Sequence, residues 1–263
     1  MSIAVVKLGG HALDASSDAA LLLDTLALDI NELRAQGHDV VLVHGGGPQI
    51  SELLEQTGVV STFLDGLRVT DGATLRAVVM GLSFVNASLC ASLAARSLRV
   101  VGCNGTAERL FQGEVASGGL GFVGANIQAS PTYIQGLLAQ GIVPVVAPFG
   151  MTGEGQLLNC NADAAAGALA GALNAETLLL LSDIDQVRRT AEDADSAISS
   201  MTSSEARSLL ASGEAKDGMR PKIDSALTAL EHGAHRVVIA NGSRPHALRD
   251  VWTNQALQTE VVA

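Results

Sequence analysis

Aromatic and basic residues are scarce in this 263-residue chain. Phe, Tyr and Trp together make up 3% of it, so a core has to be built from Ala, Val, Leu and Ile, and little aromatic surface remains for stacking bases or sugars. Lys and Arg number 16 against 27 Asp and Glu, which gives a net charge of -11. This charge disfavours long-range attraction to nucleic acid or anionic lipid, so we expect neither as a partner.

Signals for export and membrane insertion are also missing. We find no apolar run of the ~18 residues that a bilayer span needs. The first basic residue, Lys7, follows the first apolar run instead of preceding it as in a signal peptide. These absences predict a cytoplasmic protein. The three cysteines, at 90, 103 and 160, form no C-x-x-C pair, which predicts reduced thiols in the core.

Two common nucleotide-binding motifs are absent or misplaced. The chain has no G-x-x-x-x-G-K-[ST] loop. One G-x-G-x-x-G occurs at Gly119, Gly121 and Gly124, but it precedes "ANIQASP", which contains a proline and no helical period. A dinucleotide loop should open a helix. An NAD-dependent oxidoreductase would rest on this motif alone.

Alternating strands and helices run through the chain, of which 48% is hydrophobic. Short apolar runs between turn residues predict strands, and apolar residues every three or four positions predict helices. This order predicts an α/β fold with a mostly parallel sheet, helices on both faces, and ligands at the carboxyl ends of the strands. The strands are expected at 3–8, 39–47, 98–105, 141–150, 176–184 and 235–242, and helices before Gly37 and at 48–58, 72–96, 131–140, 162–173, 203–213 and 219–233.

Two segments are less regular. The Gly-rich residues 107–130 predict hairpins or a flap, and the polar residues 188–200 predict an exposed loop. The first helix is amphipathic, and its polar face is expected to hold Thr25, Asp29, Glu32 and Gln36.

Glycines follow the first two predicted strands, at Gly9–Gly10 and Gly45–Gly47, and Lys7 stands beside the first pair. In a parallel sheet both loops open on the same edge. Glycine lets backbone N–H groups approach an anion, and a following helix start adds a partial positive charge. Two ordinary turns with a surface lysine are the alternative. His44, beside the second loop, is expected to be structural.

Polar side chains precede two further helices. Arg68 suits bidentate recognition of a carboxylate, although a lone loop arginine is often solvated. Asn159, Asn161 and Asp163 alternate before an Ala-rich helix, where one of them could act only as a cap. Lys222 lies in the first turns of a helix, against the dipole, which favours either solvent or an anion such as phosphate.

Together these residues are the equipment for phosphoryl transfer to a small carboxylic acid. Six motifs resemble the amino acid kinase family, in family order and over almost the whole chain. They are "KLGG", "VHGGGPQI", "GLRVTD", "GQLLNCNAD", "LLLSDI" and "DGMRPK". "GLRVT" and the "LNxNAD" block resemble the branch that phosphorylates N-acetyl-L-glutamate, in preference to branches acting on carbamate, aspartate or uridylate.

The resemblance implies a three-layer α/β/α sandwich with an open, mostly parallel central sheet. Residues 1–171 would form an N-lobe that binds N-acetyl-L-glutamate and makes a homodimer. Residues 172–263 would form a C-lobe that binds ATP. The product would be N-acetyl-L-glutamyl 5-phosphate, in arginine biosynthesis. Mg²⁺ would bind through the nucleotide phosphates, because phosphates bind it well and it usually keeps several waters. No dedicated protein metal site is visible in the sequence.

The resemblance also implies roles for individual residues. Lys7 and Lys222 would stabilise the transferring phosphoryl group, and Asp163 would orient both. Gly9, Gly10 and Gly45 would bind phosphate. The acid substrate would contact Gly46, Gly47, Arg68, Asn159 and Asn161. The nucleotide would contact Ser182, Asp183, Ile184, Asp185, Gln186, Val187, Arg188, Glu214, Ala215 and Lys216.

The chain departs from the family pattern in three places. Ala87 and Gln186 stand where the family usually has Lys and Gly, and "CNGTAERL" replaces a Gly-rich, Asp-containing turn. Arginine-inhibited hexameric members carry an extra N-terminal helix, so we expect a dimer without that feedback. Two alternatives stay open: a kinase for another N-acylated amino acid, such as N-acetyl-aminoadipate, and a non-catalytic regulatory homologue.

Overall fold

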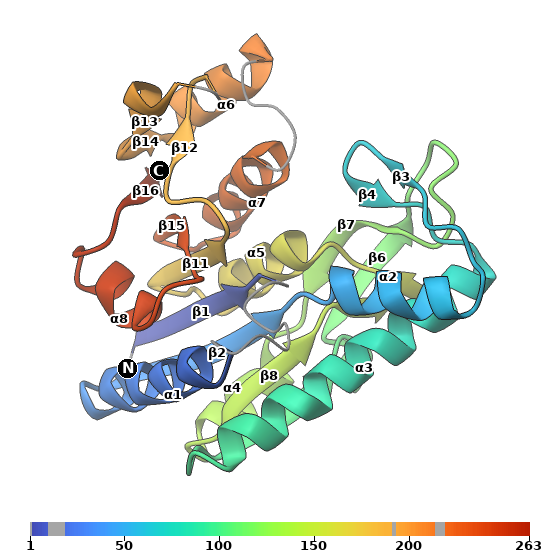
Figure 1. Ribbon diagram of the computed structural model, residues 1–263, viewed down its shortest axis with the longest axis horizontal. Coiled ribbons are helices and arrows are strands. Elements are labelled where there is room, and N and C mark those ends of the chain that lie inside the picture. Colours follow the sequence, from blue (N-terminus) through green and yellow to red (C-terminus); the bar gives the residue numbers. More distant parts are fainter. Residues whose placement is uncertain (1, 10–18, 191–192, 214–218) are drawn as a thin grey trace.

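A central parallel sheet organises the molecule. The computed structural model describes residues 2–9, 19–190, 193–213 and 219–263. Within these residues eight strands pair in the order β14-β16-β15-β11-β1-β2-β8-β5. Only the β15–β16 pair among them is antiparallel. Helices lie on both sides of this sheet (Figure 1), which confirms the predicted three-layer α/β/α fold.

The elements follow the predicted alternation closely. The main strands are β1 (Ser2–Leu8), β2 (His38–His44), β5 (Val100–Asn104), β8 (Val143–Ala147), β11 (Thr177–Ser182), β14 (Ser200–Thr202), β15 (Arg236–Asn241) and β16 (Gln258–Val262). The helices are α1 (Ala19–Ala35), α2 (Gly47–Gln56), α3 (Gly72–Ala94), α4 (Thr132–Leu138), α5 (Ala162–Ala172), α6 (Ser203–Ser212), α7 (Met219–Glu231) and α8 (Ala247–Trp252).

Both faces of the main sheet are buried. Side chains alternate along a strand, so neighbouring residues of β1 face opposite layers. Ala4, Val6 and Leu8 pack in one cluster with residues of α1, α3 and α8. Val5 packs in a second cluster with residues of α4, α5, α6 and α7. Burial on both faces explains why these strands read as continuous apolar runs. Lys7 lies two residues after Val5 and therefore faces the same layer as α5 and α7.

A second sheet lies beside the carboxyl ends of β5 and β8. It has the order β10-β9-β6-β7, built from β6 (Phe111–Val115), β7 (Gly124–Ala129), β9 (Phe149–Met151) and β10 (Leu157–Asn159). The β6–β7 hairpin confirms the hairpin predicted within 107–130. A short hairpin, β3 (Phe63–Leu64) and β4 (Leu67–Arg68), precedes α3.

Three expectations are wrong. The segment 188–200 is not only a loop, because it contains part of β12 (Val187–Arg188), then β13 (Ala197–Ile198) and the start of β14. Each of these strands has only two or three residues, which is too short for an apolar period to show. The sequence analysis also left out α8 and β16. On α1, Thr25 and Asp29 are buried instead of lying on an exposed polar face, because α8 packs against this helix.

One helix corrects the expectation about apolar runs. α3 is 23 residues long with a mean hydropathy of 1.8, enough by length and composition to cross a membrane. Of that stretch 44% is buried in the protein, where α3 packs against α2, β5 and β8. A buried core helix passes the same test, so this is weak support for a membrane span.

The three cysteines are free thiols, with Cys103 and Cys160 buried as predicted.

Candidate active site

Two lysines meet one aspartate at the carboxyl edge of the main sheet. Lys7 Nζ lies 2.8 Å from Asp163 Oδ1, and Lys222 Nζ lies 3.3 Å from Asp163 Oδ2. The three side chains are 10%, 12% and 7% exposed, respectively for Lys7, Lys222 and Asp163. Asp163 and Lys222 follow Lys7 by 156 and 215 positions in the sequence, and the fold brings all three to one point. We name this group the lysine–aspartate centre.

Local sequence explains how each member reaches this centre. Lys7 faces the layer of α5 and α7 because of the alternation along β1. Asn161 caps α5, accepting hydrogen bonds from the backbone N–H groups of Asp163 (2.9 Å) and Ala164 (3.0 Å). The cap fixes Asp163 in the first turn of α5. Lys222 lies in the first turn of α7, which packs directly against α5.

The charges of the centre are mutually dependent. Burial by itself would raise the pKa of the Asp163 carboxyl. The positive charges of Lys7 and Lys222, and the hydrogen bonds from both, outweigh that effect and hold the pKa below its usual value. Asp163 is therefore an anion at neutral pH. Two ammonium groups against one carboxylate leave a net positive site, which favours an anionic ligand such as a phosphoryl group.

The second glycine loop forms the start of α2. Gly46 is the N-cap residue, and no side-chain hydrogen bond caps this described helix start. Pro48 has no N–H, and the first N–H groups of a helix have no partner within it. A Cβ on Gly46 would lie 2.8 Å from Leu82 Cδ2, whereas one on Gly47 would meet nothing within 4 Å. The backbone here can therefore approach a ligand closely.

The other predicted phosphate residues lie differently. Gly9 N–H donates to the Leu181 carbonyl (2.9 Å), and Gly45 N–H donates to the Leu8 carbonyl (3.0 Å). Both backbone N–H groups already donate hydrogen bonds within the protein. A phosphate could therefore contact these two glycines only because the absence of side chains leaves space for it. Gly10 lies outside the described residues.

A cavity of about 210 Å³ opens beside the loop Gly45–Gly47. Apolar side chains from α2, α3, β3 and neighbouring segments form much of its wall, and Arg68 enters it from β4. The residues lining it include Ile50, Phe63, Leu82, Val123, Pro148, Arg68, Asn159 and Asn161. The cavity thus combines an apolar wall with one cation and two amides, which suits a small acid with an apolar substituent.

Arg68 is held firmly in place. Nη2 donates to the Gly47 carbonyl (3.1 Å) and to Ser51 Oγ (2.9 Å), and Nη1 donates to Ser61 Oγ. The guanidinium also stacks over the Phe63 ring at 4.6 Å from its centre. Burial lowers the pKa of Arg68 but leaves it charged at neutral pH. Sequence reasoning missed Ser51 and Ser61, which no motif marks as partners of an arginine.

The predicted amides have separate surroundings. Asn159 Nδ2 donates to Thr70 Oγ1 (3.0 Å) and Asn159 lines the cavity. Asn161 also lines it, while its Oδ1 is occupied by the cap of α5. The capping alternative for this residue is therefore confirmed, and its amide nitrogen is the group that remains for a ligand.

The predicted nucleotide residues follow β11. Asp183 is exposed, and Ile184 packs partly against the core. Gln186 Nε2 donates to the Gln258 carbonyl (3.0 Å), and Val187 N–H donates to Thr259 Oγ1 (2.8 Å). These bonds tie the segment to β16. Ser182, Asp185 and Arg188 lie in the same segment, and the predicted Glu214, Ala215 and Lys216 lie outside the described residues.

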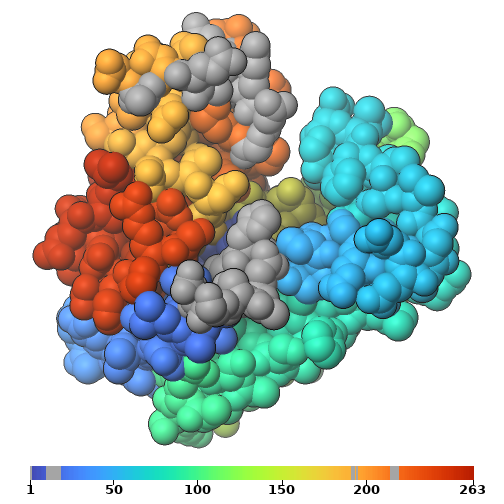
Figure 2. Space-filling model, in the orientation of Figure 1, coloured from blue at the N-terminus to red at the C-terminus, as the bar shows by residue number. Residues whose placement is uncertain are grey.

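A larger groove of about 800 Å³ runs from Asn161 between α7 and the β6–β7 hairpin. The hollow between α7 and the β3–β4 hairpin in Figure 2 is part of it. Asn161 lines both this groove and the smaller cavity, and it lies two residues before Asp163 of the lysine–aspartate centre.

His44 stands behind the glycine loop without facing either space. Its Nδ1 donates to the Gly45 carbonyl (2.7 Å), and its Nε2 accepts from Asn86 Nδ2 (3.1 Å). Burial lowers the pKa of His44 to about 4, so the imidazole is neutral at pH 7. Asn86 also donates to the Val145 carbonyl (2.9 Å). These contacts agree with a structural part for His44.

Comparison with known proteins places the chain in a family. A model of the amino acid kinase family matches residues 2–241. The chain belongs to the amino acid kinase family. Three solved structures have a similar fold. An N-acetylglutamate synthase from Neisseria gonorrhoeae, complexed with coenzyme A and N-acetyl-glutamate, has a TM-score of 0.83 at 26% identity, over 100% of this chain and 59% of that one. A carbamate kinase from Giardia lamblia bound to AMP-PNP has a TM-score of 0.70 at 17% identity, over 99% and 98%. A UMP kinase from Ureaplasma parvum has a TM-score of 0.65 at 16% identity.

Curated relatives carry a more specific name. Acetylglutamate kinase from Caulobacter sp. is 43% identical over 265 residues, which cover 93% of this chain and 84% of that protein. Acetylglutamate kinase from Symbiobacterium thermophilum is 38% identical over 271 residues, which cover 98% and 90%. Each match thus covers more than nine-tenths of this chain.

Proposed function

We propose that this chain is an ATP-dependent acetylglutamate kinase. It transfers the γ-phosphoryl group of ATP to the side-chain carboxylate of N-acetyl-L-glutamate, which gives N-acetyl-L-glutamyl 5-phosphate and ADP. The observation that carries the proposal is the Asp163 carboxylate between Lys7 and Lys222, beside a cavity that contains Arg68. The names of the curated relatives support the same reaction.

The transfer needs little proton chemistry from the protein. A glutamate side chain has a pKa near 4.3 and is already ionised at neutral pH, so no general base has to remove a proton. A carboxylate oxygen attacks the γ-phosphorus while the bond to the ADP oxygen breaks. Negative charge on the equatorial oxygens and on the leaving ADP is stabilised by Lys7 and Lys222. Asp163 holds both ammonium groups in position.

The acid substrate occupies the 210 Å³ cavity in this proposal. Arg68 pairs with the α-carboxylate through N–H groups that are not used by Ser51, Ser61 and Gly47, and Asn159 assists it. Asn161 and the helix start at Gly46 and Gly47 face the reacting carboxylate. A guanidinium fixed in advance loses little side-chain freedom on binding, so more of its contact energy goes into affinity.

The nucleotide occupies the edge formed by Ser182–Arg188, together with Glu214–Lys216. Mg²⁺ comes bound to the nucleotide phosphates. Within the described residues, no group of three or more His, Cys, Asp or Glu side chains is arranged to hold a metal ion. Mg²⁺ commonly binds through substrate phosphates and keeps several waters.

The two binding regions define two lobes. We assign residues 1–171 to an acid-binding lobe and 172–263 to a nucleotide-binding lobe. We assign homodimer formation to the first lobe, through the outer side of α3. Met80 and Phe84, one turn apart there, are 60% and 71% exposed. A second copy covering them would also account for a helix that is apolar on both sides. We also propose that the protein is located in the cytoplasm.

The test is ADP release from purified protein with MgATP and a series of acids. N-acetyl-L-glutamate is compared with N-acetyl-aminoadipate, N-acetyl-aspartate, free glutamate and no acid, and hydroxylamine traps any acyl phosphate. Preference for N-acetyl-L-glutamate, with a hydroxamate product, supports the proposal. Trapped product from another acid would replace the substrate and keep the reaction. Folded protein that binds ATP but releases no ADP with any acid would favour a regulatory homologue.

A further inference from the structure

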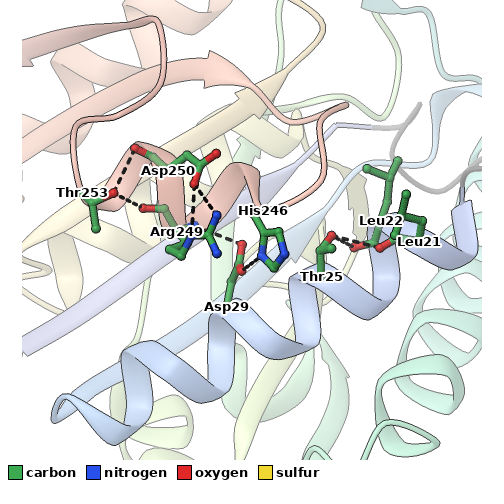
Figure 3. A network of polar contacts seen from close by, with 8 residues as sticks. All are labelled: Leu21, Leu22, Thr25, Asp29, His246, Arg249, Asp250 and Thr253. Carbon is green, nitrogen blue, oxygen red and sulfur yellow. Dashed lines mark hydrogen bonds and ion pairs between the residues drawn. The ribbon is translucent and has the colours of Figure 1, made fainter.

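A buried carboxylate on α1 joins the loop that follows β15. Asp29 is 1% exposed, and its Oδ1 lies 2.6 Å from His246 Nδ1. Its Oδ2 accepts the backbone N–H of Arg249 at 3.1 Å. Figure 3 shows Asp29 reaching from α1 to both residues of the α8 segment. The contact crosses 217 residues of sequence, and no motif of the sequence analysis includes any of these three residues.

Asp29 does for α8 what an N-cap side chain usually does. His246 stands at the N-cap position with a left-handed backbone (φ 59°) and makes no capping hydrogen bond of its own in the described structure. Arg249 is the third residue of α8, whose N–H a cap normally accepts. Because Asp29 binds this N–H and the imidazole together, it fixes both the start of α8 and the end of the preceding loop.

The same loop supports the proposed nucleotide edge at its other end. Asp185 Oδ1 accepts hydrogen bonds from Asn241 Nδ2 (3.1 Å) and from Arg244 Nη2 (2.7 Å). Gly242 N–H donates to the Ser182 carbonyl at 2.7 Å. A Cβ on Gly242 would lie 2.8 Å from Leu181 Cβ, so the loop is pressed against the end of β11. Residues 241–246 therefore run from the Asp185 side chain to the buried Asp29.

The two ends of the loop are restrained unequally. Arg244 is 59% exposed, and an exposed ion pair contributes little by itself. Asp29 is buried, and leaving a buried carboxylate without hydrogen-bond donors costs free energy. The loop therefore has one strongly favoured position, in which His246 and the backbone N–H of Arg249 contact this carboxylate. The stronger restraint thus lies at the end away from the nucleotide edge.

We propose that Asp29 and His246 are positioning residues for nucleotide binding. They hold residues 241–246, and through Asn241, Arg244 and Gly242 they set the places of Asp185 and Ser182. This inference rests on the proposed function, in which Ser182–Arg188 line the nucleotide site. ADP and ATP are both affected, because the edge binds the part of the nucleotide that the two share. The acid cavity is unaffected, since neither Asp29 nor His246 lines it.

The test compares two variants with one matched control. Asp29→Asn keeps the size of the side chain and removes its charge. His246→Asn keeps a residue that tolerates the left-handed backbone and removes the imidazole. The control is Asp24→Asn on the same helix, where Asp24 pairs with Arg96 of the α3 end and touches no part of the loop. Thermal unfolding verifies that each variant is folded, and if Asp29→Asn does not fold, His246→Asn carries the test.

ADP affinity is measured by titration calorimetry, KM for the acid by steady-state kinetics, and loop order by amide hydrogen exchange. We expect the ADP Kd to rise about tenfold in both variants, with KM for the acid within about twofold of wild type. Exchange should be faster at 183–187 and 242–246, and the Asp24→Asn protein should match wild type in all three measurements.

Opposite results separate the two proposals. Unchanged ADP affinity and unchanged exchange in both variants would overturn the positioning role, even if N-acetyl-L-glutamate is phosphorylated normally. A wild-type protein that binds ADP but ignores N-acetyl-L-glutamate would contradict the proposed substrate, and the variants would still decide the positioning role through ADP binding. A wild-type protein that binds no ADP would overturn both.

Discussion

The cavity proposed for the acid and the edge proposed for the nucleotide are built in different ways. Around the cavity, Gly45–Gly47 and Arg68 lie within 24 residues, and the buried Arg68 donates hydrogen bonds to Gly47, Ser51 and Ser61. At the nucleotide edge, Asp185 is held by Asn241 and Arg244, which lie 56 and 59 residues further along the chain. Contacts within a short stretch of sequence thus hold Arg68 in the cavity, whereas Asp185 depends on contacts between distant segments.

This difference teaches where each region is vulnerable. The cavity should respond mainly to changes in the residues that line it, because its backbone is fixed by a strand end and a helix start. The nucleotide edge should respond also to changes far from the ligand, at Asp29 and His246. The lysine–aspartate centre joins the two regions and should respond most strongly of all.

The largest effect is expected from Asp163→Asn. Without the carboxylate, Lys7 and Lys222 repel each other at the same point, and neither is held against the phosphoryl group. We expect kcat to fall about 10³-fold, with a folded protein. Steady-state kinetics measure it, and Asp24→Asn, at a residue that pairs with Arg96 and lines neither the cavity nor the groove, is the control with wild-type kcat. An Asp163→Asn enzyme within a few fold of wild type would remove the centre from the mechanism.

Arg68→Ala tests the acid side alone. Loss of a charged, preorganised partner for a carboxylate should raise KM for the acid roughly thirtyfold and leave KM for ATP nearly unchanged. The measurement is a pair of KM values at saturating co-substrate. Selective loss of ATP affinity would instead place Arg68 at the nucleotide and reverse the comparison of the two regions.

The buried His44 predicts how stability near the cavity varies with pH. Its pKa is about 4 in the folded protein, against an ordinary value of 6.5, so below pH 6.5 the unfolded chain binds a proton that the folded chain does not. Protonation of His44 in the unfolded chain therefore lowers the free energy of unfolding as the pH falls from 6.5 towards 4. Lowering the pH from 7 to 5 should decrease the free energy of unfolding by about 2 kcal/mol through this one side chain.

Urea unfolding at the two pH values measures this loss, with His44→Gln as the comparison. The variant has no titrating side chain there, so its loss of stability between pH 7 and pH 5 should be smaller by about the same amount. Equal losses in both proteins would mean that the imidazole titrates normally and is not held neutral behind the glycine loop.

The smallest effect is expected from Arg244→Ala. The pair with Asp185 is mostly exposed, so its loss should raise KM for ATP only about threefold, well below the effect of Asp29→Asn on ADP affinity. Kinetics at varied ATP measure it. A larger effect from Arg244→Ala than from Asp29→Asn would mean that the exposed end of the loop, and not the buried one, holds the nucleotide edge.

Much of the fold followed from local patterns. The comparisons confirm the family, and the structure confirms the parallel sheet and the α5 cap at Asn161. Lys7, Asp163 and Lys222 come together as the motifs indicated, because Lys7 lies near the carboxyl end of β1 and the other two lie near the starts of α5 and α7. Such residues can be placed from sequence once strand order and side-chain alternation are known.

The parts that escaped prediction depend on distant packing. Asp29 reads as a polar surface residue in α1, and only α8, which was not predicted, makes it buried. Gly9 and Gly45 read as free amide donors, yet their N–H groups bond to the ends of neighbouring strands. Ser51 and Ser61 carry no motif and acquire a part only through Arg68. In each case the partner lies on another element, which a local pattern does not reveal.

The central claim is that Lys222, paired with Asp163, stabilises the phosphoryl group during transfer. The most direct test is kcat and KM of Lys222→Ala beside wild type, with MgATP and N-acetyl-L-glutamate and hydroxamate as the product measured. The contact should be strongest in the transition state, so we predict a kcat about 10³-fold lower with modest changes in KM. An unchanged kcat would contradict the account and remove Lys222 from the reaction.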